Sequence, residues 1–529
     1  MYTRLHNFCK KEISCSFNPK AAQTKSRSCS CIALSLFKYF RRSAGAGASV
    51  ASPAFIWLPL FPSSSPNRSY LLSFHPFQRR INGHLGPASH YWTCSVDFPL
   101  LNAHDYIHPP ILRSQGVPGT APHPLLQQSL RETALRQDAW GYCPAEGEPS
   151  LREALAREMK RIYSDKGQIE QVDITPSDLA LTSGCNLAFV AIIMAIADAG
   201  DEVILPVPWY FNHQMTLTLL GISPIPLITS PSSSFLPSPS LAASLITPKT
   251  RAIALVTPNN PTGAEYPPSL ISEFARLAQE RGIALILDET YRDFITPTKP
   301  AHDLYSFDKS FEYFKSSTWR SSVISLYSFS KSYRIPGHRL GAITASPELL
   351  REVVKVLDTL QICAPRLPQL ALASLSQSPA TSLTPPATPN PQAEPSSEPV
   401  STILSSLGPD IVSTAVAIDA RHKLFRSTLE QEAPRWKIAS QGAYYAFVRH
   451  PFAGRGSEEV CRRLVEEVGV RVLPGAFFFD STSSNSTSDE LDRFIRFSVA
   501  NVSDDKVVQV CQRLGEAERK FGWDIEVEM

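Results

Sequence analysis

Two short apolar runs in this chain end beside side chains that can do chemistry. Asp288 directly follows the run at residues 283–287, and Lys331 stands four residues beyond the run at residues 323–327. The carboxyl ends of neighbouring parallel strands meet at one edge of a sheet, where ligand sites form. A lysine in a closed, partly dry site has its charged form disfavoured, so its amine becomes available as a nucleophile and base. The spacing therefore predicts a sheet edge that holds a carboxylate and a reactive amine.

The elements that must position these residues alternate regularly. Helical periodicity covers three segments and short apolar, strand-like runs cover five: helices at residues 150–163, 187–199 and 269–281, and strands at residues 202–205, 253–257, 283–287, 323–327 and 340–344. Short apolar strands separated by helices indicate βαβ crossovers and a largely parallel sheet buried on both faces. The predicted fold class is α/β.

The composition excludes several kinds of partner. The 529 residues include 51 Lys and Arg against 49 Asp and Glu, so the net charge of +2 gives no case for binding nucleic acid or an anionic membrane. No run reaches the roughly 18 apolar residues that a membrane-spanning helix needs. The 10 cysteines and 12 histidines show no metal-ligand spacing. We therefore expect no nucleic acid, no membrane and no metal.

Two regions differ in composition from the rest. Before Asp97 the only acidic residue is Glu12, whereas Lys, Arg and Ser recur throughout residues 1–100. Such a leader is typical of an organelle targeting segment, although a disordered tail or a misplaced gene start is the simpler interpretation. We expect a cytoplasmic protein, or a mitochondrial one if the leader is a transit peptide. Residues 374–409 are rich in Ser, Thr, Pro and Ala, which predicts a disordered insertion.

The stretch around Lys331 carries a more specific signal. It reads SLYSFSKSYRIPGHRLG, with Ser328 three residues before the lysine and Arg339 eight residues after it. This stretch resembles the pyridoxal-phosphate lysine segment of the class I/II aminotransferases of fold type I, the aspartate aminotransferase superfamily. Seven further segments resemble other parts of that family and occur in its order: QGVPG (115–119), GYCPAEGEPSLR (141–152), LTSGCNLA (181–188), PVPWYF (206–211), TPNNPTG (257–263), LDETY (287–291) and RFSVA (496–500).

The resemblance implies pyridoxal 5′-phosphate as the cofactor and assigns residues to its ring. Lys331 would form a Schiff base with the cofactor, be released by the substrate amine, and then move a proton between substrate and cofactor. Asp288 would keep the pyridine nitrogen protonated. Tyr291 and Asn260 would both hydrogen bond to the phenolic oxygen of the ring.

The resemblance also implies how the rest of the cofactor is held. The implied phosphate site combines backbone donors at a helix start with polar side chains: Gly184, Cys185, Asn186, Ser328 and Arg339. In the family a tyrosine of the partner subunit also reaches the phosphate, and Tyr142 matches its position, which implies a homodimer. The family spacing selects Tyr210 as the ring that stacks on the cofactor, with Trp209 as the alternative, and either aromatic could instead pack in the core.

Substrate binding is implied for three residues. Arg496 would form a bidentate pair with the α-carboxylate of the substrate, a planar match that lysine cannot reproduce. Asn260 would contribute from the opposite side, and Gly116 would let the N-terminal loop approach the substrate closely.

The resemblance finally implies a domain plan. A mostly parallel, seven-stranded sheet flanked by helices would form the large cofactor-binding domain at residues 136–350. A smaller α+β domain would occupy residues 351–529 and carry the insertion, and residues 101–135 would form an N-terminal arm and part of the small domain.

The implied activity is ping-pong transamination through an aldimine and a ketimine. An L-amino acid gives its amine to the cofactor and leaves as a 2-oxo acid, and a second 2-oxo acid takes the amine back. A lyase or an aminocyclopropane carboxylate synthase-like enzyme on the same scaffold is one alternative. A transcription regulator that senses the cofactor is another, but residues 1–100 lack the periodic helices of a winged-helix module.

Overall fold

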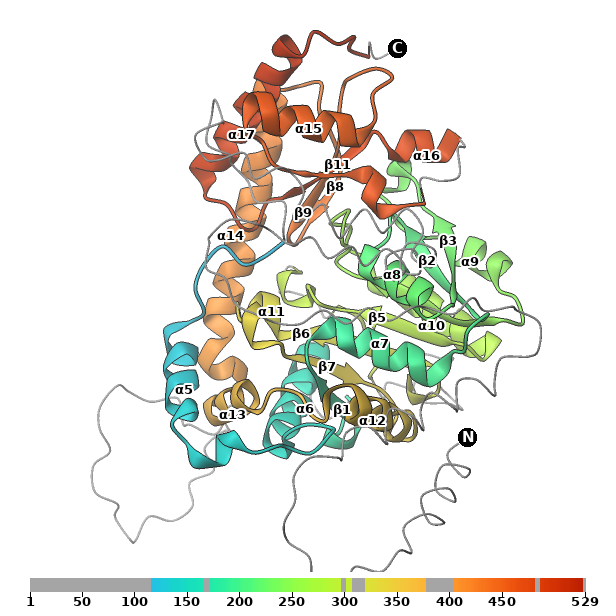
Figure 1. Ribbon diagram of the computed structural model, residues 1–529, viewed down its shortest axis with the longest axis vertical. Helices are drawn as coiled ribbons and strands as arrows, with labels where there is room; N and C mark the ends of the chain where they lie inside the picture. The colour runs from blue at the N-terminus through green and yellow to red at the C-terminus, as the bar shows by residue number, and fades with distance from the viewer. Residues whose placement is uncertain are drawn as a thin grey trace, which may run out of the picture. The chain divides into compact units, whose positions relative to one another are not determined.

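A seven-stranded sheet forms the centre of the first part of the described chain (Figure 1). The computed structural model describes residues 116–164, 172–295, 301–306, 319–376, 403–480 and 486–526. The strands are β1 (Leu179–Thr182), β2 (Glu202–Val207), β3 (Ser223–Ile228), β4 (Thr250–Val256), β5 (Ala284–Asp288), β6 (Val323–Ser328) and β7 (Gly341–Thr344). They lie in the order β1-β7-β6-β5-β4-β2-β3. Strands β2 to β6 are parallel and β7 is antiparallel to both of its neighbours, so the prediction of a mostly parallel sheet is confirmed.

Both faces of the inner part of this sheet are buried because alternate side chains of its inner strands enter different cores. In β5, Leu285 and Leu287 join one core, whereas Ile286 joins the other. The helices that supply the first core are α5 (Pro124–Ala134), α6 (Pro149–Tyr163), α9 (Pro239–Leu245), α10 (Pro268–Arg281) and α13 (Arg366–Leu375). The helices that supply the second core are α7 (Cys185–Ile196), α8 (Phe211–Leu219) and α12 (Pro347–Gln361). We call this part of the molecule the large domain.

The predicted helix at residues 269–281 is confirmed as α10, and its ends explain how β5 is placed. Pro268 occupies the first turn, where its missing N–H costs nothing, and Phe274 lies on the buried face. Gly282 ends the helix in the left-handed region at φ 65°, a conformation that favours glycine. Strand β5 begins two residues later, so Asp288 falls at its carboxyl end.

Two strands of the large-domain sheet are missed by the sequence patterns, as are the four strands of the small domain. Strand β1 has only four residues, LALT, and all four are buried, so it shows no alternation of apolar and polar residues. Strand β3 reads SPIPLI and lies at the edge of the sheet. Pro224 and Pro226 are tolerated there because an edge strand has one side on which no N–H is needed for pairing.

A four-stranded antiparallel sheet forms the second part of the described chain, which we call the small domain. Its strands lie in the order β10-β11-β9-β8. The elements are α14 (Ile403–Glu432), β8 (Lys437–Gly442), β9 (Tyr445–Arg449), α15 (Ser457–Val468), β10 (Leu473–Pro474), α16 (Ser486–Leu491), β11 (Phe494–Ser498) and α17 (Asp504–Lys520). Helices α14, α15 and α17 share an apolar core with the sheet. Figure 1 draws these elements in orange to red, the colours of the C-terminal part of the chain.

The expected insertion at residues 374–409 reaches too far at both ends. Helix α13 continues to Leu375, and α14 already begins at Ile403 and passes through Pro409. Leu407 and Ile411, four residues apart, belong to the core of the large domain, and this helical spacing explains why the end of the stretch is ordered. The expected leader at residues 1–100 lies outside the described residues, as do residues 377–402.

Short 3-10 helices connect several elements: η2 (Gln137–Trp140), η4 (Pro176–Asp178), η5 (Pro231–Ser233), η6 (Arg292–Phe294), η8 (Trp319–Ser321), η9 (Pro336–His338) and η10 (Gly475–Phe478). Across the part of the chain that the structure describes, no helix combines the length and the apolar character needed to cross a membrane.

Candidate active site

The carboxyl ends of β5 and β6 bring the predicted carboxylate and amine to one edge of the sheet. Asp288 is the last residue of β5 and pairs in register with Leu326 of β6. The chain leaves β6 at Ser328 and enters α11 (Phe329–Ser332), whose third residue is Lys331. The Ser328 hydroxyl accepts a hydrogen bond from the Ser330 N–H at 3.3 Å and so caps this short helix.

The Asp288 carboxylate is buried and held by several donors. His213 Nε2 lies 3.2 Å from Asp288 Oδ2. Thr290 donates its backbone N–H at 3.0 Å and its hydroxyl at 2.6 Å to Asp288 Oδ1. Burial would raise the pKa of Asp288, but the hydrogen bonds and charge of His213 and the bonds from Thr290 outweigh it, so this pKa is lowered. A buried carboxylate that stays ionised can hold a proton on a ring nitrogen.

His213 is a site residue that the sequence analysis missed. It lies on α8, and its ring stacks on Phe189 of α7 with the centroids 3.8 Å apart. A single histidine in the first turn of a helix has no local signal that separates it from an ordinary core residue. Only the packing of α7 and α8 beside β5 shows that it faces Asp288.

The Lys331 amine is nearly enclosed. Its Nζ donates a hydrogen bond to the Gly116 carbonyl and lies 5.8 Å from the Tyr291 ring centroid and 5.6 Å from that of Tyr444. Burial, followed by the positive charges of Arg496 and Arg339, lowers the pKa of Lys331 from its ordinary 10.5 to about 8. At pH 7 roughly a tenth of the amine is therefore neutral and nucleophilic, far more than for an ordinary lysine.

Arg496 and Asn260 meet across the two domains. Arg496 lies on β11, is only 4% exposed, and donates from Nη1 to Asn260 Oδ1 at 2.7 Å. Its guanidinium carbon lies 4.5 Å from the Tyr445 ring centroid. Asn260 comes from a tight loop in which the neighbouring Asn259 Oδ1 accepts from the Thr262 N–H and hydroxyl. Asn259 thus shapes the loop while Asn260 faces a guanidinium that is suited to a carboxylate ligand.

Tyr445 is the second site residue that the sequence analysis missed. Its hydroxyl lies 2.7 Å from the Tyr291 hydroxyl. A Cβ on Gly116 would come within 1.9 Å of the Tyr445 hydroxyl, so a larger residue here would have to displace the Tyr445 ring. The structure therefore gathers Gly116, Tyr291, Lys331 and Arg496 around Tyr445.

The start of α7 forms the end of the site that is suited to an anion. Gly184 caps the helix at φ 89°, and a Cβ there would lie 2.4 Å from Arg339 Nη2. The free N–H groups of the first turn and the guanidinium thus face the same space, as phosphate sites require. The Cys185 thiol turns toward Asp288, 3.7 Å from Oδ1, and burial raises the pKa of this thiol.

Ser328 reaches this same end through the sheet. It pairs in register with Gly341 of β7. A Cβ on Gly341 would lie 2.6 Å from the Gly184 carbonyl carbon. The structure therefore brings Ser328, Gly184 and Arg339 into one neighbourhood.

The two aromatic candidates for ring stacking have different surroundings. Trp209 is buried in the second core of the large domain, and its backbone N–H donates to the Phe478 carbonyl at 2.8 Å. The Tyr210 hydroxyl donates to Asn186 Oδ1 at 3.2 Å and accepts from Asn212 Nδ2 at 2.8 Å. Because Tyr210 also lies against His213, with centroids 5.1 Å apart, the geometry favours Tyr210.

Tyr142 is not brought together with the other predicted residues within one chain. Its side chain is 77% exposed, as is 74% of Trp140 nearby. Its assignment to a partner's site stays a prediction.

The residues present fit pyridoxal phosphate. An ionised buried carboxylate suits a protonated pyridine nitrogen, a lysine with a lowered pKa suits an aldehyde, and a glycine-capped helix start beside a guanidinium suits a phosphate.

Comparison with known proteins agrees with this chemistry. The family model that describes aminotransferase class I and II matches residues 116–514. The chain is 27% identical to aromatic aminotransferase ISS1 of Arabidopsis thaliana, over 69% of this chain and 82% of that protein. It is also 27% identical to valine–pyruvate aminotransferase of Mycobacterium tuberculosis, over 76% of this chain and 89% of that protein. A double mutant of Thermus thermophilus aspartate aminotransferase shares the fold, with a TM-score of 0.65 at 23% identity over 83% of this chain and 98% of that one.

Proposed function

The chain belongs to the aminotransferase class I and II family, and from that premise we propose which of its residues carry the reaction. The protein is a pyridoxal-phosphate-dependent transaminase that moves an amino group from an amino acid to a 2-oxo acid. The observation that supports the residue assignment is the meeting of a lysine of lowered pKa with an ionised buried carboxylate at one sheet edge.

Three side chains act on the reacting centre. Bound pyridoxal phosphate supplies an aldehyde carbon and an electron-poor ring that stabilises negative charge on the substrate α-carbon. Lys331 Nζ would take the proton from the substrate α-carbon and deliver it to the cofactor carbon C4′. Asp288 holds a proton on the ring nitrogen. Burial raises the pKa of Tyr291 well above its ordinary value, so its hydroxyl stays protonated and donates to the phenolic oxygen, where Asn260 also binds.

Arg496 binds the α-carboxylate of the substrate. Its guanidinium is buried and already bonded to the Asn260 side chain, which fixes its plane. A fixed planar fork can donate two parallel hydrogen bonds to a carboxylate. Gly116 lets its own backbone approach the space in which the substrate carboxylate would bind.

The phosphate of the cofactor binds at the start of α7. Gly184, Cys185 and Asn186 supply backbone donors there, and Ser328 and Arg339 supply side-chain donors. Tyr210, whose ring lies beside His213, would stack on the cofactor ring.

The active form is a homodimer in which Tyr142 of one subunit completes the phosphate site of the other. The exposure of both Tyr142 and Trp140 supports this, because a pair of large exposed aromatics is typical of an interface. Sedimentation of the holoenzyme tests it, and a fully active monomer would contradict it.

We propose that the protein acts in the cytoplasm. The five described cysteines are all free, in keeping with a reducing compartment. Fractionation of cells that carry a C-terminally tagged chain tests the location. Recovery of the tag inside mitochondria would identify the leader as a transit peptide.

Borohydride reduction tests the residue assignment most directly. The reduced and digested holoenzyme should carry the pyridoxyl group on the peptide that contains Lys331, and a tag on another peptide would refute the assignment. A panel of amino donors with one fixed 2-oxo acid then defines the specificity. Release of ammonia or thiol in place of amine transfer would indicate a lyase on this fold.

A further inference from the structure

Tyr445 joins two parts of the proposed active site through a single side chain. It is the first residue of β9, is 2% exposed, and its ring packs edge-on against Tyr291 with the centroids 5.5 Å apart. Its hydroxyl lies 2.7 Å from the Tyr291 hydroxyl, and the Arg496 guanidinium carbon lies 4.5 Å from its ring centroid. Tyr445 thus connects a residue assigned to the cofactor with a residue assigned to the substrate.

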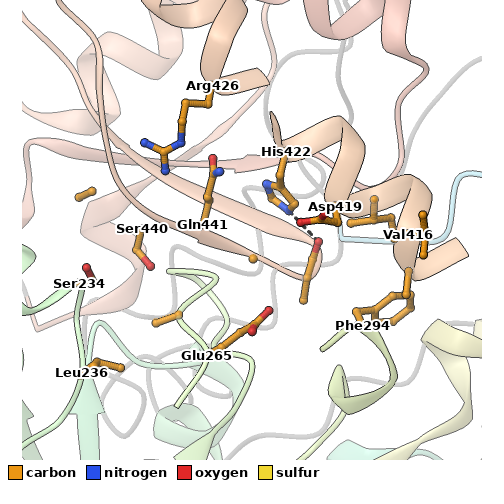
Figure 2. A pocket seen from close by; sticks show the side chains of 16 residues that line it. Ser234, Leu236, Glu265, Phe294, Val416, Asp419, His422, Arg426, Ser440 and Gln441 are labelled. Atoms are coloured by element: carbon orange, nitrogen blue, oxygen red, sulfur yellow. Dashed lines mark hydrogen bonds between the residues drawn. The ribbon is translucent and has the colours of Figure 1, made fainter. Parts of the chain in front are cut away.

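The β8–β9 hairpin that carries Tyr445 is held in place by contacts between backbones. A Cβ on Gly263 would lie 2.4 Å from the Tyr445 carbonyl oxygen, and a Cβ on Gly442 would lie 2.4 Å from the Gly263 carbonyl oxygen. Residues 439–443 of the hairpin line a separate pocket of about 440 Å³, where Figure 2 shows Ser440, and Tyr445 is not among the lining residues. The hairpin therefore presents Ser440 to the pocket and Tyr445 to the active site.

The direction of the hydrogen bond between the two tyrosines follows from their hydrogens. Each hydroxyl has one hydrogen to donate and can also accept. Burial, and then the neighbouring Tyr445, raise the pKa of Tyr291 well above its ordinary value, so Tyr291 keeps its hydrogen. In the proposed function this hydrogen is donated to the phenolic oxygen of the cofactor. Tyr291 can then only accept from Tyr445, which makes Tyr445 the donor of the pair.

We propose that Tyr445 is a positioning residue with two roles, an inference that rests on the proposed function. Its hydroxyl donates to Tyr291, and a hydroxyl that accepts a hydrogen bond becomes a stronger donor in turn, by about 10 to 30% per bond. Its ring supports the Arg496 guanidinium through a cation–π contact. Phe478 lies 5.2 Å from the same guanidinium carbon, so two rings contact this group.

The first role predicts a change in the absorbance of the bound cofactor. The Schiff base that Lys331 forms gains and loses a proton as pH changes, and the cofactor absorbance follows this titration. A donor to the phenolic oxygen favours the full negative charge that this oxygen carries when the Schiff base is unprotonated. The donor therefore keeps the titration midpoint at lower pH, and a weaker donor moves the midpoint to higher pH.

Absorbance titration of the holoenzyme tests the role of the hydroxyl. Tyr291→Phe removes the direct donor and should move the midpoint upward by about 1 to 2 pH units, whereas Tyr445→Phe keeps the ring and should move it upward by about 0.2 to 0.6. Tyr444→Phe is the matched control, because the Tyr444 hydroxyl lies 3.5 Å from the Lys331 carbonyl oxygen, and it should leave the midpoint unchanged. Ser440→Ala removes a hydroxyl on the pocket side of the hairpin and should also leave it unchanged.

The single and double variants separate two ways of failing. If Tyr291→Phe moves the midpoint and Tyr445→Phe does not, the role of the Tyr445 hydroxyl is overturned and the assignment of Tyr291 stands. If neither variant moves the midpoint, the assignment of Tyr291 in the proposed function fails as well. The double variant should match Tyr291→Phe alone, because the Tyr445 hydroxyl acts only through Tyr291. A further upward move in the double variant would overturn this route.

Steady-state kinetics with the best amino donor of the panel described above test the role of the ring. Tyr445→Leu removes the aromatic face beside Arg496, so KM for the donor should rise about 3- to 30-fold. Tyr445→Phe keeps that face and should change KM by less than about twofold. Borohydride tagging of Lys331 in the Tyr445→Leu protein checks that the site still forms. Equal KM values in the tagged Leu and Phe variants would overturn the role of the ring.

Discussion

The two walls of the proposed active site, one assigned to the cofactor and one to the substrate, are built in different ways. The cofactor wall, formed by Asp288, Ser328 and Lys331, lies at the strand ends of the large domain, and the donors that hold Asp288 also belong to that domain. The substrate wall, formed by Tyr445 and Arg496, lies on β9 and β11 of the small domain. Its hydrogen bonds cross to Tyr291 and Asn260 of the large domain. In the proposed assignment, cofactor recognition is thus nearly complete within one domain, whereas substrate recognition exists only where the domains meet.

The largest effect is expected on the cofactor wall. Lys331→Ala removes both the nucleophile and the base, so transamination should fall by a factor of about 10⁴ or more, and the pyridoxyl tag should disappear. Steady-state kinetics and mass spectrometry of the reduced protein measure the two effects. Lys355→Ala, at an exposed lysine of α12, is the control. Residual tagging of the Lys331→Ala protein at full stoichiometry would refute the role of this lysine.

A substitution on the substrate wall should separate the two functions. Arg496→Lys keeps the charge but loses the planar fork, so kcat/KM should fall about 100-fold, equal to about 2.7 kcal/mol. The affinity for pyridoxal phosphate, measured by equilibrium dialysis, should change by less than about threefold, since the cofactor is held by the other domain. Arg493→Lys, a nearby arginine that pairs with Glu526, is the control. A parallel loss of cofactor would show that the walls are not independent.

A substitution of His213 tests whether its contact with Asp288 keeps that carboxylate ionised. His213→Phe keeps an aromatic ring beside Phe189 but removes the donor to Asp288, so kcat near pH 7 should fall about 10- to 100-fold. The lowered pKa of Asp288 should rise without this partner. Because Asp288 is ionised only above its pKa, the acid limb of the kcat profile should move to higher pH. His213→Gln retains a donor and should restore part of the activity, and an unshifted acid limb in His213→Phe would contradict the role.

The pH dependence of cofactor capture should be the mildest effect. Only the neutral amine of Lys331 reacts, and its neutral fraction rises as pH increases through its pKa of about 8. The rate at which cofactor-free enzyme captures pyridoxal phosphate should therefore rise roughly tenfold from pH 7 to pH 9 and then level off. Stopped-flow absorbance follows this reaction. A rate that keeps rising to pH 10.5 would mean that the amine is as exposed to solvent as an ordinary lysine.

The sequence predicts the cofactor wall better than the substrate wall for a physical reason. Asp288 and Lys331 follow apolar runs that can be recognised as buried strands, and parallel strands bring such ends together. Arg496 and Asn260 lie 236 positions apart, and only the family resemblance predicted that both serve the substrate. His213 and Tyr445 remained hidden because their partners come from other elements, and no local spacing records such a contact.

The elements show the same limit. Helix α10 is predictable because its period, its first-turn proline and its terminal glycine agree. Strand β3 is not, because its two prolines oppose a strand and only its position at the sheet edge permits them. Composition also misleads near Pro409, where a proline-rich stretch gives way to a helix that is held by packing against the large domain.

The backbones of Gly263 and Gly442 are in direct contact where the two domains meet: a Cβ on Gly442 would lie 2.4 Å from the Gly263 carbonyl oxygen. Neither position has room for a methyl group, so the width of the gap is set by bare backbone. Any larger residue at either position would wedge the small domain outward and enlarge the space between Arg496 and Lys331 for every substrate alike. These two glycines therefore fix the distance between Arg496 and Lys331, although neither glycine contacts the substrate.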